Sequence, residues 1–348
     1  MRRKLILIFS ALFFAAIPRS SPAAQPGTVI EEFRLPAGDP GLSLYVRNKH
    51  PAGQEKFSPG RILLYVHGAT YPAETSFDLA LGGLSWMDYI AAHGYDVYLV
   101  DVRGYGLSTR PPEMSQPAEQ NPPIVRTEVA IGDVATAVDF ILKRRGVPRI
   151  DLLGWSWGTS IMGGYAARHP DKVEKLVLYA PLWLPSGAAL ADPGKTLGAY
   201  RAVSVADAKA RWYNGVPEAK KKTLIPEGWF DLWAQATFAT DAEGARQTPP
   251  VLRAPNGVLA DRREFWEAGK PLYDPSLITA PTLIVHAEWD ADLPSPHSHA
   301  LFAKLTNARY KRFVEIGEGT HTVLMEKNRL QLFLEVQHFL DEEPREGQ

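Results

Sequence analysis

The sequence predicts an α/β protein in which a mostly parallel β-sheet carries helices on both faces. Two observations lead to this prediction. From Arg61 onward, short runs rich in Val, Leu and Ile alternate with longer stretches whose apolar residues recur about every 3.6 positions, the period of an α-helix. The short runs are apolar almost throughout, which is typical of parallel strands that are buried on both faces.

The elements can be assigned in chain order. Residues 29–36 and 42–49 are expected to form an antiparallel hairpin at one edge of the sheet. The strands that follow are predicted at residues 61–66, 96–102, 150–155, 173–180, 280–287 and 311–317. Helices are predicted at residues 84–93, 129–144, 158–169, 295–305 and 324–341. Such helices provide the crossovers that parallel strand pairing needs.

The alternation of strands and helices stops between Pro181 and Asp274. Roughly ninety residues are too many for one connection in a compact domain. We therefore predict a mainly helical cap at residues 182–274, inserted into a core that comprises residues 25–181 and 275–348. Because the insert is rich in aromatic residues, we expect an apolar or aromatic substrate.

The N-terminus has the pattern of a secretory signal peptide at residues 1–24. A basic start, MRRK, precedes the apolar run LILIFSALFFAAI and a stretch of small residues, with cleavage expected after Ala23 or Ala24. This apolar run is too short to span a bilayer. We therefore expect a secreted or periplasmic protein with no stable membrane insertion after cleavage.

The composition excludes several classes of function. The chain has 38 Lys and Arg residues against 39 Asp and Glu residues, so it lacks the basic excess of a nucleic-acid-binding domain. It has no cysteine, which excludes a Cys nucleophile, thiolate zinc sites and iron–sulfur clusters.

One motif suggests a nucleophile. Gly154-Trp155-Ser156-Trp157-Gly158 fits G-x-S-x-G and lies between a predicted strand and a predicted helix, which is the context that the motif requires. An ordinary strand-to-helix turn is the alternative. A Cβ at Gly154 or Gly158 is expected to collide with neighbouring backbone in such a strained turn. We therefore predict that Ser156 is a catalytic nucleophile.

A serine nucleophile needs a base and an acid that orients the base. Asp290 and His321 each follow a predicted strand, and the order Ser156, Asp290, His321 is the one expected after this motif. Asp292 is an alternative acid, but the spacing of Asp290 to Pro294 favours Asp290. Other imidazoles in the region are His286, His297, His299 and His338. A metal site built from Asp290, Asp292, His297 and His299 would leave Ser156 and His321 unexplained.

Two backbone N–H groups are predicted to form an oxyanion hole. One belongs to Trp157, directly after the nucleophile. The other comes from the loop His67-Gly68-Ala69-Thr70 after the first core strand, and Ala69 is the favoured residue. The hydroxyls of Thr70 or Tyr71 could add a donor, and His67 is interpreted as structural.

Several segments together resemble the α/β-hydrolase superfamily. They are YVHGAT (65–70), DVRGYGLS (101–108), GWSWG (154–158), APTLIVHAEWDADLP (280–294) and GEGTHT (317–322). The resemblance implies an eight-stranded, mostly parallel sheet and a serine-hydrolase mechanism without a cofactor. Ser156 stands where haloalkane dehalogenases and epoxide hydrolases have Asp. The HGAT loop also differs from the HGGPG of proline iminopeptidases and the HGGG of hormone-sensitive-lipase-like esterases.

The sequence thus predicts an exported hydrolase of small carboxylic esters that acts through Ser156, His321, Asp290 and an acyl-enzyme. The residues do not separate an esterase from a thioesterase, lactonase, amidase or acyltransferase, because these share a nucleophile and differ in pocket contacts. A non-catalytic binding protein on the same scaffold is the alternative from another class.

Overall fold

One sheet of eight strands organises the protein. The structure, a computed structural model, describes residues 27–184 and 196–343, so the predicted signal peptide at residues 1–24 lies outside the described residues. The strands follow the spatial order β1–β2–β4–β3–β5–β6–β9–β10. They are β1 (Thr28–Pro36), β2 (Ser43–Pro51), β3 (Ile62–Val66), β4 (Asp96–Asp101), β5 (Ile150–Trp155), β6 (Val173–Tyr179), β9 (Thr282–Ala287) and β10 (Lys311–Ile316).

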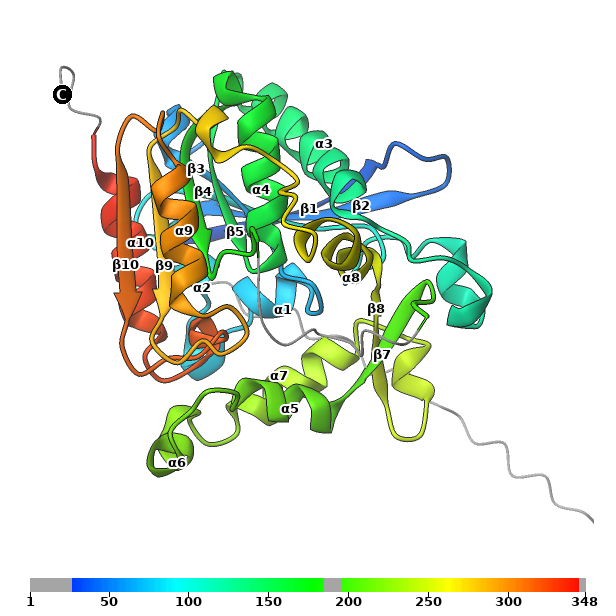
Figure 1. Ribbon diagram of the computed structural model, residues 1–348. Coiled ribbons are helices and arrows are strands. Elements are labelled where there is room, and N and C mark those ends of the chain that lie inside the picture. Colours follow the sequence, from blue (N-terminus) through cyan, green and yellow to red (C-terminus); the bar gives the residue numbers. More distant parts are fainter. Residues whose placement is uncertain (1–26, 185–195, 344–348) are drawn as a thin grey trace, which may run out of the picture.

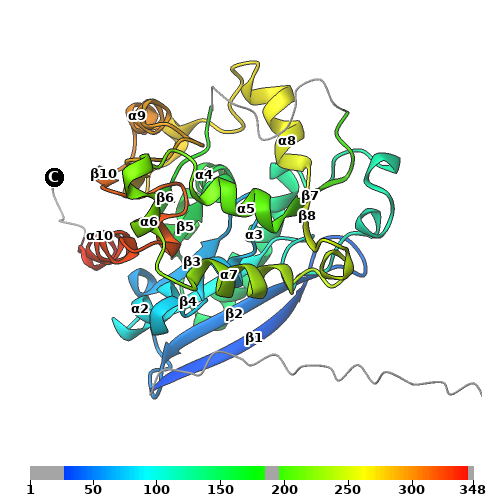
Figure 2. The same cartoon turned by 90° about the horizontal axis from the view of Figure 1, so that it is seen from below.

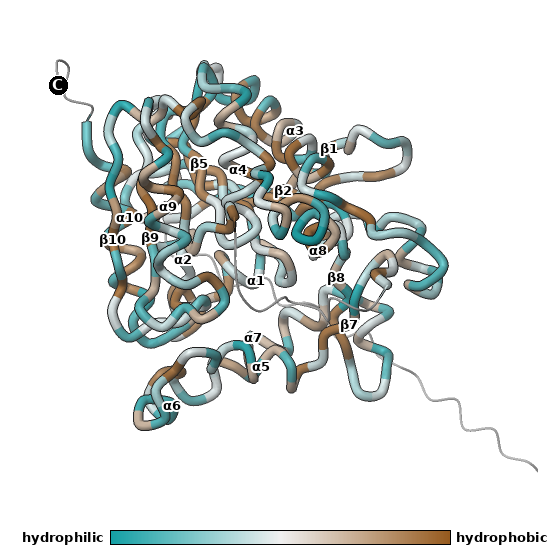
Figure 3. The backbone as a smooth tube through the Cα atoms, in the orientation of Figure 1, coloured by the Kyte–Doolittle hydropathy of each residue, from teal (hydrophilic) through white to brown (hydrophobic). Residues whose placement is uncertain are grey.

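The pairing of these strands confirms the predicted sheet. β1 and β2 are antiparallel to each other, and β2 is antiparallel to β4. The remaining neighbours are parallel. Every residue of the central strands β3 and β5 is buried, which agrees with their continuous apolar sequences. Figure 3 shows these hydrophobic residues along the central strands, with more hydrophilic residues in the outer loops.

Helices cover both faces of the sheet (Figure 1). α3, α4 and α9 bury apolar residues against one face, and α1, α2 and α10 against the other. The helices are α1 (Ala73–Phe77), α2 (Trp86–Ala92), α3 (Thr127–Arg145), α4 (Trp157–Arg168), α5 (Val205–Trp212), α6 (Lys221–Leu224), α7 (Trp229–Phe238), α8 (Gly257–Asp261), α9 (Ser295–Lys304) and α10 (Arg329–Asp341). In the described part of the chain, no helix combines the length and apolarity that crossing a membrane requires.

Two helices differ from the prediction. α1 is not among the helices predicted from the sequence, because its five residues are too few to display a helical period. The last helix begins at Arg329 and not at residue 324. Residues Val323–Met325 instead form a 3₁₀ turn, and Glu326 has extended backbone. The side chain of Glu326 accepts the backbone N–H of Thr320, which folds this turn back onto the preceding loop.

The segment between β6 and β9 contains α5 to α8 and a pair of antiparallel strands, β7 (Tyr200–Ser204) and β8 (Val251–Pro255). This strand pair is absent from the sequence-based prediction of a mainly helical insert. Figures 1 and 2 show α5 and α7 across the end of the sheet toward which the arrowhead of β10 points. Whether residues 182–274 form a separate cap stays a prediction.

Aromatic residues of this segment pack against the core. Trp233 of α7 lies edge-on to Tyr71, with ring centroids 4.7 Å apart, and Trp212 of α5 contacts Trp233 at the same distance. Because Tyr71 belongs to the loop after β3, the segment is anchored beside the carboxyl ends of the strands. Ligands bind at this end of open α/β sheets.

Candidate active site

Ser156 occupies the sharp turn between β5 and α4. Its backbone has φ 56° and ψ −120°, a strained conformation that costs a non-glycine residue about 1–3 kcal/mol. A Cβ at Gly154 would lie 2.2 Å from the carbonyl oxygen of Gly158, and a Cβ at Gly158 would lie 2.6 Å from that of Val66. The predicted collisions are therefore confirmed, and both glycines are needed to form this turn.

The structure brings Ser156, Asp290 and His321 into contact. Nε2 of His321 lies 2.9 Å from Oγ of Ser156, and Nδ1 lies 2.8 Å from Oδ2 of Asp290. All three residues are buried. Oδ1 of Asp290 accepts the backbone N–H groups of Asp292 and Leu293. The carboxylate is thus fixed through both oxygens, and it orients the imidazole toward the hydroxyl.

Asp292, the alternative acid, has other partners. Nε of Arg211 lies 2.6 Å from its Oδ2, and Nδ2 of Asn214 lies 2.8 Å from its Oδ1. Burial disfavours the charged form of Asp292, but the Arg211 guanidinium outweighs burial and holds the pKa of this carboxyl well below its usual range. Asp292 is therefore an ionised partner of Arg211, and the structure places Asp290 on the imidazole instead.

The other histidines lie outside the contacts of Ser156. His286 is buried in β9 beside Ser298. His299 is exposed on α9 and bonds to Ser295, and His338 is exposed on α10. Within residues 27–184 and 196–343, no group of three or more His, Asp or Glu side chains is arranged to hold a metal ion.

The loop after β3 is shaped by His67. Burial lowers the pKa of His67 to about 4, so its imidazole is neutral at pH 7. Nδ1 lies 2.7 Å from the carbonyl oxygen of Gly68, and Nε2 accepts the backbone N–H of Val102 at 3.1 Å. Since C=O and N–H point in opposite directions across a trans peptide, this bond turns the N–H of Ala69 away from His67. His67 is thus structural, as interpreted from the sequence.

Gly68 lets this loop approach the nucleophile closely. A Cβ at Gly68 would lie 3.1 Å from Cβ of Ser156 and 3.4 Å from the carbonyl oxygen of Trp155. The N–H of Trp157, at the first position of α4, is one of the helix-terminal groups that have no partner within the helix. Ala69 and Trp157 therefore flank Ser156, and their role as oxyanion donors stays a prediction.

His321 is held by contacts that the sequence alone did not predict. Nε1 of Trp155 and the hydroxyl of Tyr179 donate to its backbone carbonyl at 3.0 and 2.8 Å. Thr320 and Thr322, on either side of it, both donate hydroxyl bonds to the carboxylate of Glu326. The sequence Thr-His-Thr followed by Glu326 was the signal that could have indicated these contacts. It indicates them only if the chain folds back after β10.

Glu326 is nearly fully buried, and burial raises its pKa to about 7, although bonds from Thr320 and Thr322 favour the ionised form. The unfolded chain therefore loses this proton at lower pH than the folded protein. The protonated carboxyl of Glu326 contributes fully to the free energy of unfolding below about pH 4.5. This contribution falls by about 3 kcal/mol as the pH rises to about 7. We expect Glu326→Gln to lose less stability than wild type between pH 5 and pH 8.

Urea unfolding at the two pH values measures this difference. Glu227→Gln, the same change at an exposed position, is the control and should follow the wild type. An identical pH dependence for wild type and Glu326→Gln would contradict the proposed titration of Glu326.

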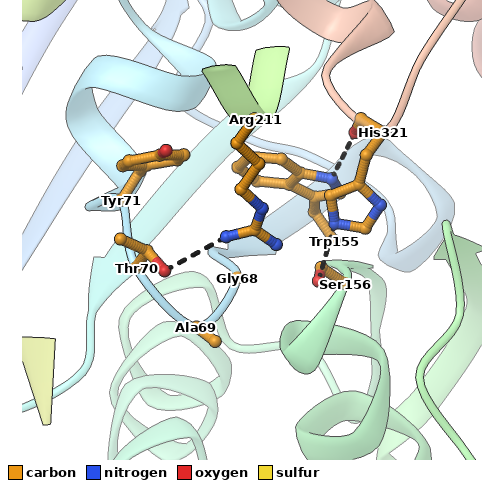
Figure 4. Close-up of a pocket in the computed structure, with 8 residues that line it drawn as sticks. All are labelled: Gly68, Ala69, Thr70, Tyr71, Trp155, Ser156, Arg211 and His321. Atoms are coloured by element: carbon orange, nitrogen blue, oxygen red, sulfur yellow. Dashed lines mark hydrogen bonds between the residues drawn. The ribbon is translucent and has the colours of Figure 1, made fainter. Parts of the chain in front are cut away.

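A small pocket opens at Ser156, with a cavity volume of about 10 Å³. Figure 4 shows the guanidinium of Arg211 between the loop at Thr70 and the side chains of Trp155 and His321. The lining is therefore mixed, with aromatic walls, several hydroxyl groups and a cation. Its residues are Gly68, Ala69, Thr70, Tyr71, Trp155, Ser156, Arg211 and His321.

A family model described as the alpha/beta hydrolase fold matches residues 61–328. The chain belongs to this family. Serine hydrolase BPHL from Homo sapiens is 25% identical over 313 residues, which cover 88% of this chain and 86% of the human protein. Among solved structures with the α/β-hydrolase fold, a thermophilic esterase from Thermogutta terrifontis has a TM-score of 0.60 at 16% identity, covering 89% of this chain and 98% of that one.

A shorter match is closer in sequence. A pimeloyl-[acyl-carrier protein] methyl ester esterase from Neisseria meningitidis serogroup B is 41% identical to this α/β hydrolase over 76 residues. The match takes 20% of this chain and spans only 29% of that esterase's length. The family assignment therefore rests on the family model, which matches residues 61–328.

Proposed function

We propose that this protein is a serine esterase that hydrolyses small carboxylic esters. One observation carries the proposal, the unbroken chain of hydrogen bonds from Oγ of Ser156 through His321 to Asp290. Membership of the α/β-hydrolase fold family supports an esterase-type hydrolase. So do the relatives that are named as an esterase and as a serine hydrolase.

In the proposed reaction, Nε2 of His321 accepts the proton of Ser156 as Oγ attacks the ester carbonyl. Asp290 stabilises the imidazolium and keeps its Nδ1–H in place. The N–H groups of Ala69 and Trp157 bind the oxyanion of the tetrahedral intermediate. The C–O bond then breaks, and the alcohol leaves with the proton from the imidazolium. Water attacks the acyl-enzyme by the same route and releases the carboxylic acid.

The pocket favours a short substrate. Its cavity volume of about 10 Å³ is far below the 300–1,000 Å³ of typical small-molecule sites. Tyr71 and Trp155 offer aromatic walls to an apolar part of the substrate. We therefore propose an ester with a short acyl group, in keeping with the expected apolar or aromatic contact.

Hydrolysis of p-nitrophenyl esters from acetate to decanoate, beside thioesters and lactones, tests the proposal. We expect the highest kcat/KM for the shortest acyl chains and slower turnover of matched thioesters and lactones. A folded protein that hydrolyses no ester would contradict the proposal. Faster turnover of a thioester than of its matched ester would assign a different acyl chemistry to the same residues.

We also propose that the protein is exported, on the strength of the basic and apolar pattern of residues 1–24. Expression of the full chain in a Gram-negative host, followed by N-terminal sequencing of the extracytoplasmic fraction, is expected to find a mature chain that begins at Ala24 or Gln25. Recovery of the protein only from the cytoplasm, with the first residues intact, would contradict export.

A further inference from the structure

Two guanidinium groups from the segment between β6 and β9 meet at the hydroxyl of Thr70, which lines the same pocket as Ser156. Nη1 of Arg211, on α5, lies 3.3 Å from the hydroxyl oxygen of Thr70. Nη2 of Arg201, on β7, lies 2.9 Å from the same oxygen. Two cations that share one hydroxyl acceptor repel each other, and the repulsion is strong where water is scarce. A buried pair of this kind needs nearby negative charge to offset it.

Among the described residues, a single carboxylate pairs with these two cations. Oδ2 of Asp292 lies 2.6 Å from Nε of Arg211. Arg201 instead donates to neutral oxygens, including the carbonyls of Ala69 and Pro255 at 2.6 and 2.8 Å. The pair and Asp292 together therefore carry one uncompensated positive charge.

The pKa shifts agree with this distribution of charge. Burial lowers the pKa of Arg201, and the neighbouring Arg211 lowers it further. Burial also acts to lower the pKa of Arg211, but Asp292 outweighs it and the pKa is raised. Asp290 forms no ion pair with either guanidinium, since its oxygens bond to His321 and to two backbone N–H groups. Its negative charge acts on Arg211 only at a distance, where it also favours the charged guanidinium.

Arg211 is the member of this positively charged group that reaches the place where a substrate would bind. Arg211 lines the same pocket as Ser156 and His321, and one fifth of its side chain is exposed. Its hydrogen bonds to Asp292 and Thr70 use Nε and Nη1. Figure 4 shows the remaining nitrogen of the guanidinium on the side that faces Ser156 and Trp155. An anion in the pocket would thus meet a guanidinium that is already positioned.

We propose that Arg211 binds a carboxylate of the substrate while Ser156 attacks an ester carbonyl a few bonds away. This inference rests on the proposed esterase function and narrows its substrate class to short half-esters of dicarboxylic acids. A carboxylate is the favoured anion because guanidinium and carboxylate match in geometry and form charge-assisted hydrogen bonds. The small pocket keeps the two ends of the substrate close together.

Monomethyl succinate and dimethyl succinate provide a matched pair of substrates, because they share a carbon skeleton and differ in charge. We expect wild type to favour the monoester in kcat/KM. Arg211→Gln should lower kcat/KM for the monoester by about 10- to 100-fold, as the loss of a charge-assisted hydrogen bond implies. For the neutral diester we expect a change of less than about threefold. Methanol release followed by NMR measures both reactions.

Lys209→Gln is the control for charge. Lys209 is an exposed residue of the same helix, and it contacts the ring of Phe230 and does not line the pocket. The Lys209→Gln substitution should leave the rates of both reactions unchanged. A wild-type preference for the diester would overturn the inference while leaving the esterase function intact. Equal losses for both esters in Arg211→Gln would assign Arg211 a structural or oxyanion-stabilising role, which also overturns it.

Binding to the Ser156→Ala protein separates the inference from the esterase function, because binding needs no turnover. Succinate is expected to bind this protein in isothermal titration calorimetry, and its neutral analogue succinamide is not. When Arg211→Gln is combined with Ser156→Ala, the affinity for succinate should fall at least tenfold. Equal affinity for succinate and succinamide would contradict a carboxylate site even if the protein hydrolyses no ester.

Discussion

Replacement of Ser156 by Ala is expected to lower kcat for ester hydrolysis by about five to six orders of magnitude, the loss found when a serine nucleophile is removed from a comparable triad. The physical reason is that Oγ of Ser156 forms the covalent bond of the acyl-enzyme. Among the described residues, Nε2 of His321 forms a hydrogen bond with no other hydroxyl. Steady-state hydrolysis of a short p-nitrophenyl ester measures the effect.

Ser76→Ala is the matched control for this substitution. The hydroxyl of Ser76 is buried but has no hydrogen-bond partner among the described residues, so its removal should leave both stability and activity close to wild type. Ser156→Ala should also keep its thermal unfolding midpoint within a few degrees of wild type. A folded Ser156→Ala protein that retained a tenth of the wild-type rate would contradict the role of Ser156.

Replacement of Asp290 by Asn is expected to lower kcat by about 10⁴-fold, because an amide can hold the imidazole in the wrong tautomer and gives the imidazolium no negative charge. Asp292→Asn should lower the rate for a neutral ester by no more than about tenfold. Asp292 bonds to Arg211 and Asn214, whereas Asp290 bonds to His321. Kinetics of the two variants on one neutral ester measure this difference.

The two variants serve as controls for each other, since each removes one negative charge from the same loop. The reverse ranking, with the larger loss in Asp292→Asn, would show that Asp292 orients the base and that the contact of Asp290 is not the catalytic one. Equal losses would indicate that both substitutions act by disturbing the loop after β9.

Ser156 and His321 could be predicted from sequence because their positions follow from local constraints. Close backbone contacts at Gly154 and Gly158 restrict those positions to glycine, which leaves a recognisable pattern around the serine. His321 follows β10, which pairs in parallel with β9, and parallel strands bring their carboxyl ends to one edge. The sequence around the end of a single parallel strand is thus enough to predict that a residue lies at the active site.

Arg201, Arg211 and Glu326 could not be predicted in the same way. Arg211 reaches Thr70 only because α5 lies across the end of the sheet, a placement set by contacts between residues far apart in sequence. The pairing of β7 with β8 joins segments separated by some four dozen residues with no turn motif between them. Glu326 gains its role from the turn after His321, which the sequence pattern assigned to a helix.

Labelling with a fluorophosphonate, followed by peptide mass spectrometry, tests the contact of the three side chains most directly. A phosphonyl group on Oγ of Ser156 in the wild-type protein is the expected result, and His321→Ala should reduce the labelling rate by several orders of magnitude. Unmodified Ser156 in folded protein, or labelling that proceeds equally fast without the imidazole, would mean that the serine is not activated by its neighbours.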